Sequence, residues 1–168
     1  MQRAKIYTIL TYILIPCSFL ILFFAFFALL MTLSAPQMII IAFLLFCVVI
    51  YTFKSSKFFL YNVRKEQPAK EADKAWIRIN GFITLFFALQ LLLSGITALS
   101  DPETIAKSIA MLQASIPSDQ LAQMPGTAVL AQAIKGMSVV FIIYGVLQSL
   151  HVLMGLPILR KYSYLFSE

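Results

Sequence analysis

The sequence predicts an all-α integral membrane protein, a single domain over residues 1–168 built as a bundle of four transmembrane helices. Three observations lead to this prediction. Charged residues make up 12% of the chain and apolar residues 61%, whereas soluble domains carry about 25% charged residues. Four long apolar runs follow one another, and basic residues flank them mostly on one side. A chain with mean hydropathy +0.90 has too few polar groups to cover a surface in water.

The first predicted span covers about residues 6–33, a run without charge. As a helix it would be about 42 Å long, more than the roughly 30 Å hydrocarbon core requires, so it must tilt, kink or protrude. Pro16 is the expected kink site because proline removes one helical hydrogen bond. The run is too long for the apolar core of a cleaved signal peptide, and we interpret it as a retained anchor.

The second span is predicted over about residues 37–61, antiparallel to the first, after a tight turn at Ser34, Ala35 and Pro36. A polar segment over residues 62–76 is the expected cytoplasmic loop. The third span is predicted over about 77–99, with Trp76 at the interface. The fourth runs over about 129–159, is closed by Pro157, and is followed by two basic residues.

Orientation is predicted from the distribution of Lys and Arg. Of the 13 basic residues, all but Lys107 and Lys135 lie with the N-terminus, the 62–76 loop or the C-terminus. Basic residues concentrate on the cytoplasmic side of membrane proteins, so both termini are predicted there. The same basic face is expected to attract anionic lipid head groups rather than nucleic acid. The residues expected to contact head groups are Lys54, Lys57, Arg64, Lys65, Arg160 and Lys161.

The loop over residues 100–127 is the one sizeable predicted extracytoplasmic segment. Asp101, Pro102 and Glu103 form a typical helix start. Ile105, Ile109, Leu112 and Ile116 then recur at helical spacing, which predicts an amphipathic helix that Pro117 ends. The helix could lie on the membrane surface or form a lid over the bundle, and a plain linker is the alternative.

Polar residues inside the spans are the candidate ligand or helix-contact sites, since a polar group in hydrocarbon needs a partner. These candidates are Asn80, Gln90, Ser94, Lys135, Gln148 and His151. Gln90 lies near mid-depth and should face the bundle or a partner protein. Lys135 is expected to extend outward to the membrane surface, with contact to an anionic lipid or substrate group as the alternative. Hydrogen bonds that hold helices together are the simplest role for the other side chains. A ligand head group or haem iron is the alternative for His151 and Gln148, and a substrate path is the alternative for Gln90 and Ser94.

No catalytic, zinc, phosphate-loop or dinucleotide motif occurs, and no cysteine pair suggests a redox site, so neither an enzyme nor a cofactor is predicted. Two functions remain. The first is a subunit, assembly factor or regulator of a membrane complex, or a homo-oligomer, favoured by a Phe-rich first span. The second is a small transporter or lipid-binding or small-molecule carrier with a polar site between two helical hairpins. The small size and compact loops favour a bacterial inner membrane.

Overall fold

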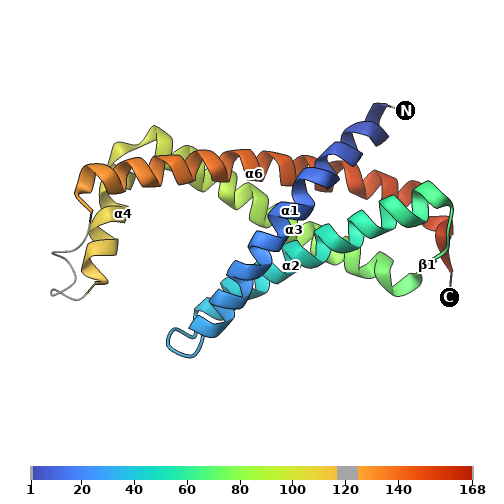
Figure 1. The fold of residues 1–168 in the computed structure, drawn as a ribbon, viewed down its shortest axis with the longest axis horizontal. Coiled ribbons are helices and arrows are strands. Elements are labelled where there is room, and N and C mark those ends of the chain that lie inside the picture. Colours follow the sequence, from blue (N-terminus) through green and yellow to red (C-terminus); the bar gives the residue numbers. More distant parts are fainter. Residues whose placement is uncertain (1, 117–124, 168) are drawn as a thin grey trace. The chain divides into compact units, whose positions relative to one another are not determined.

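The computed structural model describes residues 2–116 and 125–167 and is 88% helical. Its helices are α1 (Gln2–Met31), α2 (Met38–Lys57), the π-helix η1 (Phe58–Val63), α3 (Glu71–Ser100), α4 (Pro102–Ala114), α6 (Thr127–Lys161) and the 3₁₀ turn η2 (Ser163–Leu165). Two short strands, β1 (Ala69–Lys70) and β2 (Phe166–Ser167), complete the described elements (Figure 1).

Four helices of the described residues are long and apolar enough to cross a membrane, which confirms the four predicted spans at that level. They extend beyond the expected limits, since α3 begins at Glu71 and α6 reaches Lys161. The expectation that Pro157 closes the fourth span is wrong, because α6 continues through Pro157. A proline removes one hydrogen bond, and transmembrane helices tolerate that loss where neighbouring groups compensate. The predicted break at Pro117 lies outside the described residues.

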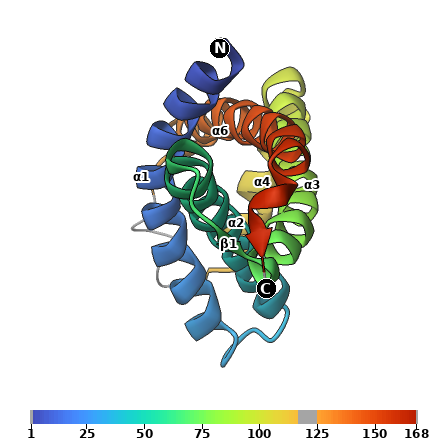
Figure 2. The same ribbon diagram turned by 90° about the vertical axis from the view of Figure 1, so that its right-hand side faces the viewer.

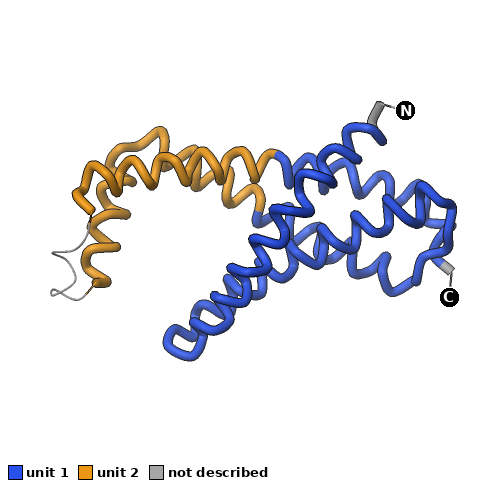
Figure 3. Tube along the Cα trace, viewed as in Figure 1, with its two compact units in different colours: residues 1–87, 147–168 blue, residues 88–146 orange. Residues whose placement is uncertain are grey.

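The chain divides into two compact units, coloured separately in Figure 3. Unit 1 contains residues 1–87 and 147–168, and unit 2 contains residues 88–146. The helices α3 and α6 each contribute one part to unit 1 and another to unit 2. Each unit is described by itself below.

Unit 1 begins with the antiparallel hairpin of α1 and α2, which run side by side in Figure 1. The expected turn is present: the Ala35 amide donates to the Met31 carbonyl at 2.9 Å, and the Met38 amide donates to the Ala35 carbonyl at 2.9 Å. Buried residues on α1 recur at helical spacing at Tyr7, Leu14, Ala25 and Ala28. This stripe is the face that packs, and the remaining apolar face is exposed.

The connection between α2 and α3 and the C-terminal tail meet in unit 1. Strand β1 pairs in parallel with β2, with Ala69 opposite Phe166. Figure 2 shows the C-terminal end of the chain beside β1. The ring of Phe166 stacks on Phe58 with 4.7 Å between centroids. The Asn62 side chain orders the connection by donating to the carbonyls of Gln67 at 3.2 Å and Pro68 at 2.7 Å. These contacts put the connection and the C-terminal tail at the same end of the unit.

Unit 2 depends on two close approaches between α3 and α6 at glycines. A Cβ at Gly95 would lie 2.8 Å from the carbonyl oxygen of Ser138, and one at Gly145 would lie 2.9 Å from the carbonyl oxygen of Ala88. Small residues allow transmembrane helices to approach this closely, and close approach supplies much of their packing energy. The parts of α3 and α6 in unit 2 are therefore held together by close backbone contact.

This packing predicts opposite effects for two glycine substitutions on unit 2. Gly95→Ala places a methyl group against backbone, so we expect it to destabilise the protein by about 1–3 kcal/mol. Gly136→Ala is the matched control, because no atom lies within 4 Å of the added Cβ, and it should be neutral or stabilise by up to about 1 kcal/mol. Unfolding in mixed micelles measures both. A Gly95→Ala protein as stable as Gly136→Ala would contradict the close packing.

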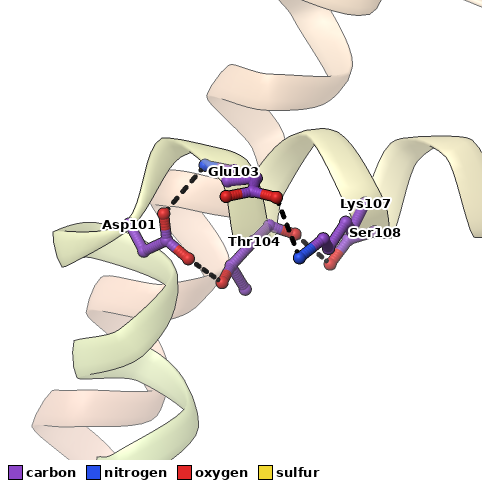
Figure 4. Close-up of polar contacts among 5 residues, drawn as sticks. All are labelled: Asp101, Glu103, Thr104, Lys107 and Ser108. Carbon is purple, nitrogen blue, oxygen red and sulfur yellow. Dashed lines mark hydrogen bonds and ion pairs between the residues drawn. The ribbon is translucent and has the colours of Figure 1, made fainter.

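Helix α4 begins at the predicted cap. The Asp101 carboxylate accepts hydrogen bonds from the Glu103 amide at 3.0 Å and the Thr104 hydroxyl at 2.6 Å (Figure 4). These hydrogen bonds, that from Thr104 foremost, hold the pKa of the Asp101 carboxyl below its usual value of 3.8. Ile105 and Ile109 of the predicted apolar stripe are buried, whereas Leu112 is 43% exposed. The helix is thus anchored mainly through its first two turns.

The cap predicts how α4 responds to acid. A carboxyl whose folded pKa is lowered stabilises the helix above its unfolded pKa, and this contribution disappears as pH falls through the folded value. The protection of the Glu103 and Thr104 amides against hydrogen exchange, relative to the intrinsic exchange rate at each pH, should therefore be highest near neutral pH and fall well below pH 3.8. Asp101→Ala should lower this protection near neutral pH, because alanine cannot cap a helix. Asp101→Asn, which caps without titrating, should remove the acid sensitivity; if it keeps it, another group is responsible.

Candidate functional site

A cluster of polar side chains is buried among α1, α2 and α6 of unit 1. We call it the buried polar cluster. All six side chains are at most 1% exposed. Its members are Tyr7, Thr11, Tyr51, Thr52, Gln148 and His151. Helix α1 supplies the first two, α2 the next two, and α6 the last two. Three helices that are otherwise apolar therefore place their polar groups in contact with one another.

His151 lies at the centre of this cluster. Its ring stacks on Tyr7, with centroids 4.4 Å apart and planes 14° apart, and the ring of Tyr51 meets it edge-on at 5.6 Å. Its Nε2 lies 3.2 Å from the Thr11 hydroxyl oxygen. The imidazole is thus fixed in position by two aromatic rings and one hydrogen bond.

The hydrogen bonds of Thr11 favour one tautomer of His151. The Thr11 hydroxyl donates to the Tyr7 carbonyl at 2.8 Å. We therefore assign the proton in the contact between Thr11 and His151 to Nε2. Nδ1 is then unprotonated, and within the described residues this buried atom has no hydrogen-bond partner. The cluster therefore contains one buried hydrogen-bond acceptor, the lone pair of Nδ1, to which no described residue donates a hydrogen bond.

Two further contacts join α2 to α6. The Gln148 Nε2 donates to the Thr52 hydroxyl oxygen at 3.3 Å, and the Tyr51 hydroxyl donates to the His151 carbonyl at 3.3 Å. The Tyr7 and Tyr51 hydroxyls also interact with each other, and both lie within about 3.1 Å of the position of a Cβ at Gly155. Glycine at this position leaves the space that the two hydroxyls occupy.

The arrangement can link helices but offers no surface to a ligand. No member of the cluster lines either of the two clefts described below. Among the residues that the structure describes, no group of three His, Cys, Asp or Glu side chains could hold a metal ion. The chemistry available at the cluster is hydrogen bonding between helices in a dry environment.

The other predicted site residues lie apart from this cluster. Asn80 is buried in unit 1, where its Nδ2 donates to the Trp76 carbonyl at 2.8 Å on its own helix. Gln90 and Ser94 are exposed and line a cleft of about 580 Å³ in unit 2, together with Thr97. Lys135 is exposed in unit 2. The structure therefore brings Gln148 and His151 together in one unit and Gln90 and Ser94 together in the other.

The residues predicted to contact lipid head groups are mostly exposed. Lys54 is the exception, being half-buried and ion-paired with Asp73. Lys65 and Lys161 lie over the rings of Tyr61 at 4.8 Å and Tyr162 at 5.4 Å. The exposed members are Lys57, Arg64, Lys65, Arg160 and Lys161.

Sequence reasoning missed Tyr7, Thr11, Tyr51 and Thr52 as members of the buried cluster. A signal for them exists: Tyr7 and Thr11 are four residues apart and so share one face of an otherwise apolar helix. Tyrosine near a span end is normally assigned to the membrane interface, and threonine satisfies its hydroxyl on its own helix. Because of these two usual assignments, the sequence alone did not indicate that Tyr7 and Thr11 belong to a buried polar cluster.

The tautomer of His151 predicts how the cluster responds to substitution. Thr11→Val removes the acceptor for the Nε2 proton and should destabilise by about 1–2 kcal/mol. His151→Phe keeps the aromatic stack and leaves no orphaned donor, so it should be better tolerated. The double variant should be more stable than Thr11→Val alone, and unfolding in mixed micelles compares the three. Simple additivity of the two effects would contradict the assigned hydrogen bond.

Comparison of the chain with protein-family models, with curated proteins and with solved structures finds no significant match.

Proposed function

We propose that the chain is a multi-pass membrane protein that works by associating with another transmembrane chain. In this role it would be a subunit, assembly factor or regulator of a membrane complex, or a homo-oligomer. The observation that carries the proposal is an exposed amide in the middle of a span. Gln90 lies near the centre of the apolar part of α3, and its side chain is exposed.

An amide facing hydrocarbon is unfavourable unless it is hydrogen-bonded, by several kcal/mol on scales without hydrogen-bonding solvent. Within the described residues the Gln90 side chain makes no hydrogen bond. Ser94 and Thr97 are exposed beside it and line the same cleft of unit 2. Polar side chains of this kind join transmembrane helices, so a second chain seated on this cleft would satisfy them.

The proposed orientation has the termini and the connection over residues 64–70 in the cytoplasm and α4 outside. Eleven of the 13 Lys and Arg residues support it. The pairing of β1 with β2 adds support, because it requires the connection and the C-terminal tail to share one side. A bacterial inner membrane is the proposed location, consistent with the small size of the chain.

The carrier alternative receives less support. A carrier would need a polar site open to its cargo, whereas Gln148 and His151 are 0% exposed and Gln90, which is exposed, belongs to the other unit. The four phenylalanines of the first span do not discriminate between the functions. Phe23, Phe24, Phe26 and Phe27 are all at least 50% exposed, as expected for contact with either lipid or protein.

Site-specific photo-crosslinking in native membranes tests the proposed association. A photoreactive residue at Leu93, which is 62% exposed and lines the cleft, should give a covalent protein adduct. An adduct of twice the chain mass would identify a second copy, and any other mass a different subunit. Ile143, 55% exposed on α6 of the same unit and outside the cleft lining, is the control position.

A second set of variants separates the role of Gln90 from general hydrophobicity. Gln90→Leu should abolish the adduct formed at position 93. Gln132→Leu, the same change at an exposed residue of unit 2 outside the cleft lining, should leave it unchanged. Adducts with lipid alone at position 93, or equal protein adducts at positions 93 and 143, would overturn the proposal.

A further inference from the structure

Besides the cleft of unit 2, the structure has a cleft in unit 1 that is lined by both basic and apolar residues. It has a volume of about 890 Å³ and lies between the beginning of α3 and the end of α6. This volume is within the roughly 300–1,000 Å³ typical of small-molecule sites. We call it the basic groove. It is lined by Glu71, Lys74, Ala75, Arg78, Ile79, Phe82, Leu156, Leu159, Arg160 and Ser163.

The groove changes from charged to apolar along both of its walls in the same direction. On α3 the charged residues come first, and the wall ends at Phe82, four residues into the apolar run that follows Arg78. On α6 the order is reversed, with Leu156 before Arg160. Because α3 enters the apolar region where α6 leaves it, the charged ends of both walls coincide. The groove therefore has a cationic rim and an apolar floor.

The two guanidinium groups of the rim are available to an anion. Within residues 2–116 and 125–167, the carboxylate on the groove, Glu71, pairs with Lys74 at 3.3 Å. Arg78 and Arg160 are exposed, and neither is ion-paired in this part of the chain. Guanidinium groups bind phosphate through paired, charge-assisted hydrogen bonds. Two unpaired ones on facing walls make a suitable phosphate clamp.

We propose that the basic groove binds one anionic phospholipid. Arg78 and Arg160 hold its head-group phosphate, and one acyl chain lies against Phe82 and Leu156. A soluble phosphate compound would use the rim but leave the apolar floor empty. Ile79 and Phe82 are 60% and 54% exposed, so the floor is open to the surrounding hydrocarbon. A lipid satisfies both ends of the groove at once.

This site is independent of the proposed association, because the groove belongs to unit 1 and the Gln90 cleft to unit 2. The proposed orientation enters only in naming the leaflet, which would be the cytoplasmic one. The Gln90→Leu protein should bind the lipid as the parent chain does, so either proposal can fail without the other.

Native mass spectrometry of the full chain, delipidated in mild detergent, tests the proposal. Phosphatidylglycerol and phosphatidylcholine with identical acyl chains are the probes. We expect one phosphatidylglycerol molecule to bind at least about tenfold more tightly than phosphatidylcholine, as expected for charge-assisted contacts. Arg78→Gln combined with Arg160→Gln should remove this preference.

The matched control is Lys5→Gln combined with Lys70→Gln. This pair removes the same charge from exposed residues of unit 1 that lie outside the groove lining, and it should keep the preference. A second groove variant, Ala75→Trp, changes no charge and should weaken binding of both lipids by filling the groove. Circular dichroism and elution volume check that each variant remains folded.

Three outcomes would overturn the proposal. One is an equal loss of preference in the control pair, which would indicate attraction to the whole basic face. Another is unchanged lipid binding in the Ala75→Trp protein. The third is displacement of the lipid by glycerol 3-phosphate at a concentration similar to that of the lipid, which would indicate a site for a soluble anion.

Discussion

The structure depends on a constraint set by its solvent: in hydrocarbon, apolar side chains gain nothing by leaving lipid for protein. Helices of such a chain must associate through close packing and through polar contacts. Both appear, and they are distributed differently between the units. Unit 2 brings backbones together at Gly95 and Gly145, whereas unit 1 joins three helices through the cluster around His151. Large apolar residues, the usual core of a soluble protein, instead lie exposed over much of the four long helices.

The same constraint explains why the polar residues in the apolar helices indicate which contacts a helix makes. Each must be satisfied on its own helix, by another helix, or by something outside the chain. Asn80 follows the first course with the Trp76 carbonyl, and Gln148 follows the second with Thr52. Gln90 follows neither within the described residues, although it lies near the middle of the apolar part of α3. Gln148 therefore stabilises the fold, whereas Gln90 is available to a partner.

The sequence was sufficient to predict the number of long apolar helices, the turn after the first and the cap at Asp101, because each follows from a local pattern. Hydropathy marks where an apolar run stops, so it did not predict that the helices continue through polar residues such as Glu71 and Lys161. The sequence could not predict that Tyr7 stacks on His151 or that Arg78 and Arg160 line the same groove. Those contacts join residues far apart in the chain and depend on helix rotation, which an all-round apolar helix does not reveal.

The basic residues serve two proposed roles: one sets the orientation of the chain in the membrane, and the other binds a lipid in the basic groove. Basic residues at span ends orient a membrane protein, and this role needs charge but no particular geometry. Lys57, Arg64 and Lys65 are exposed in that general way, whereas Arg78 and Arg160 face one groove whose floor is apolar. Two cations on facing walls repel each other unless an anion lies between them. A phosphate there would therefore stabilise the pairing of α3 with α6 in unit 1, so that the lipid would act as part of the structure.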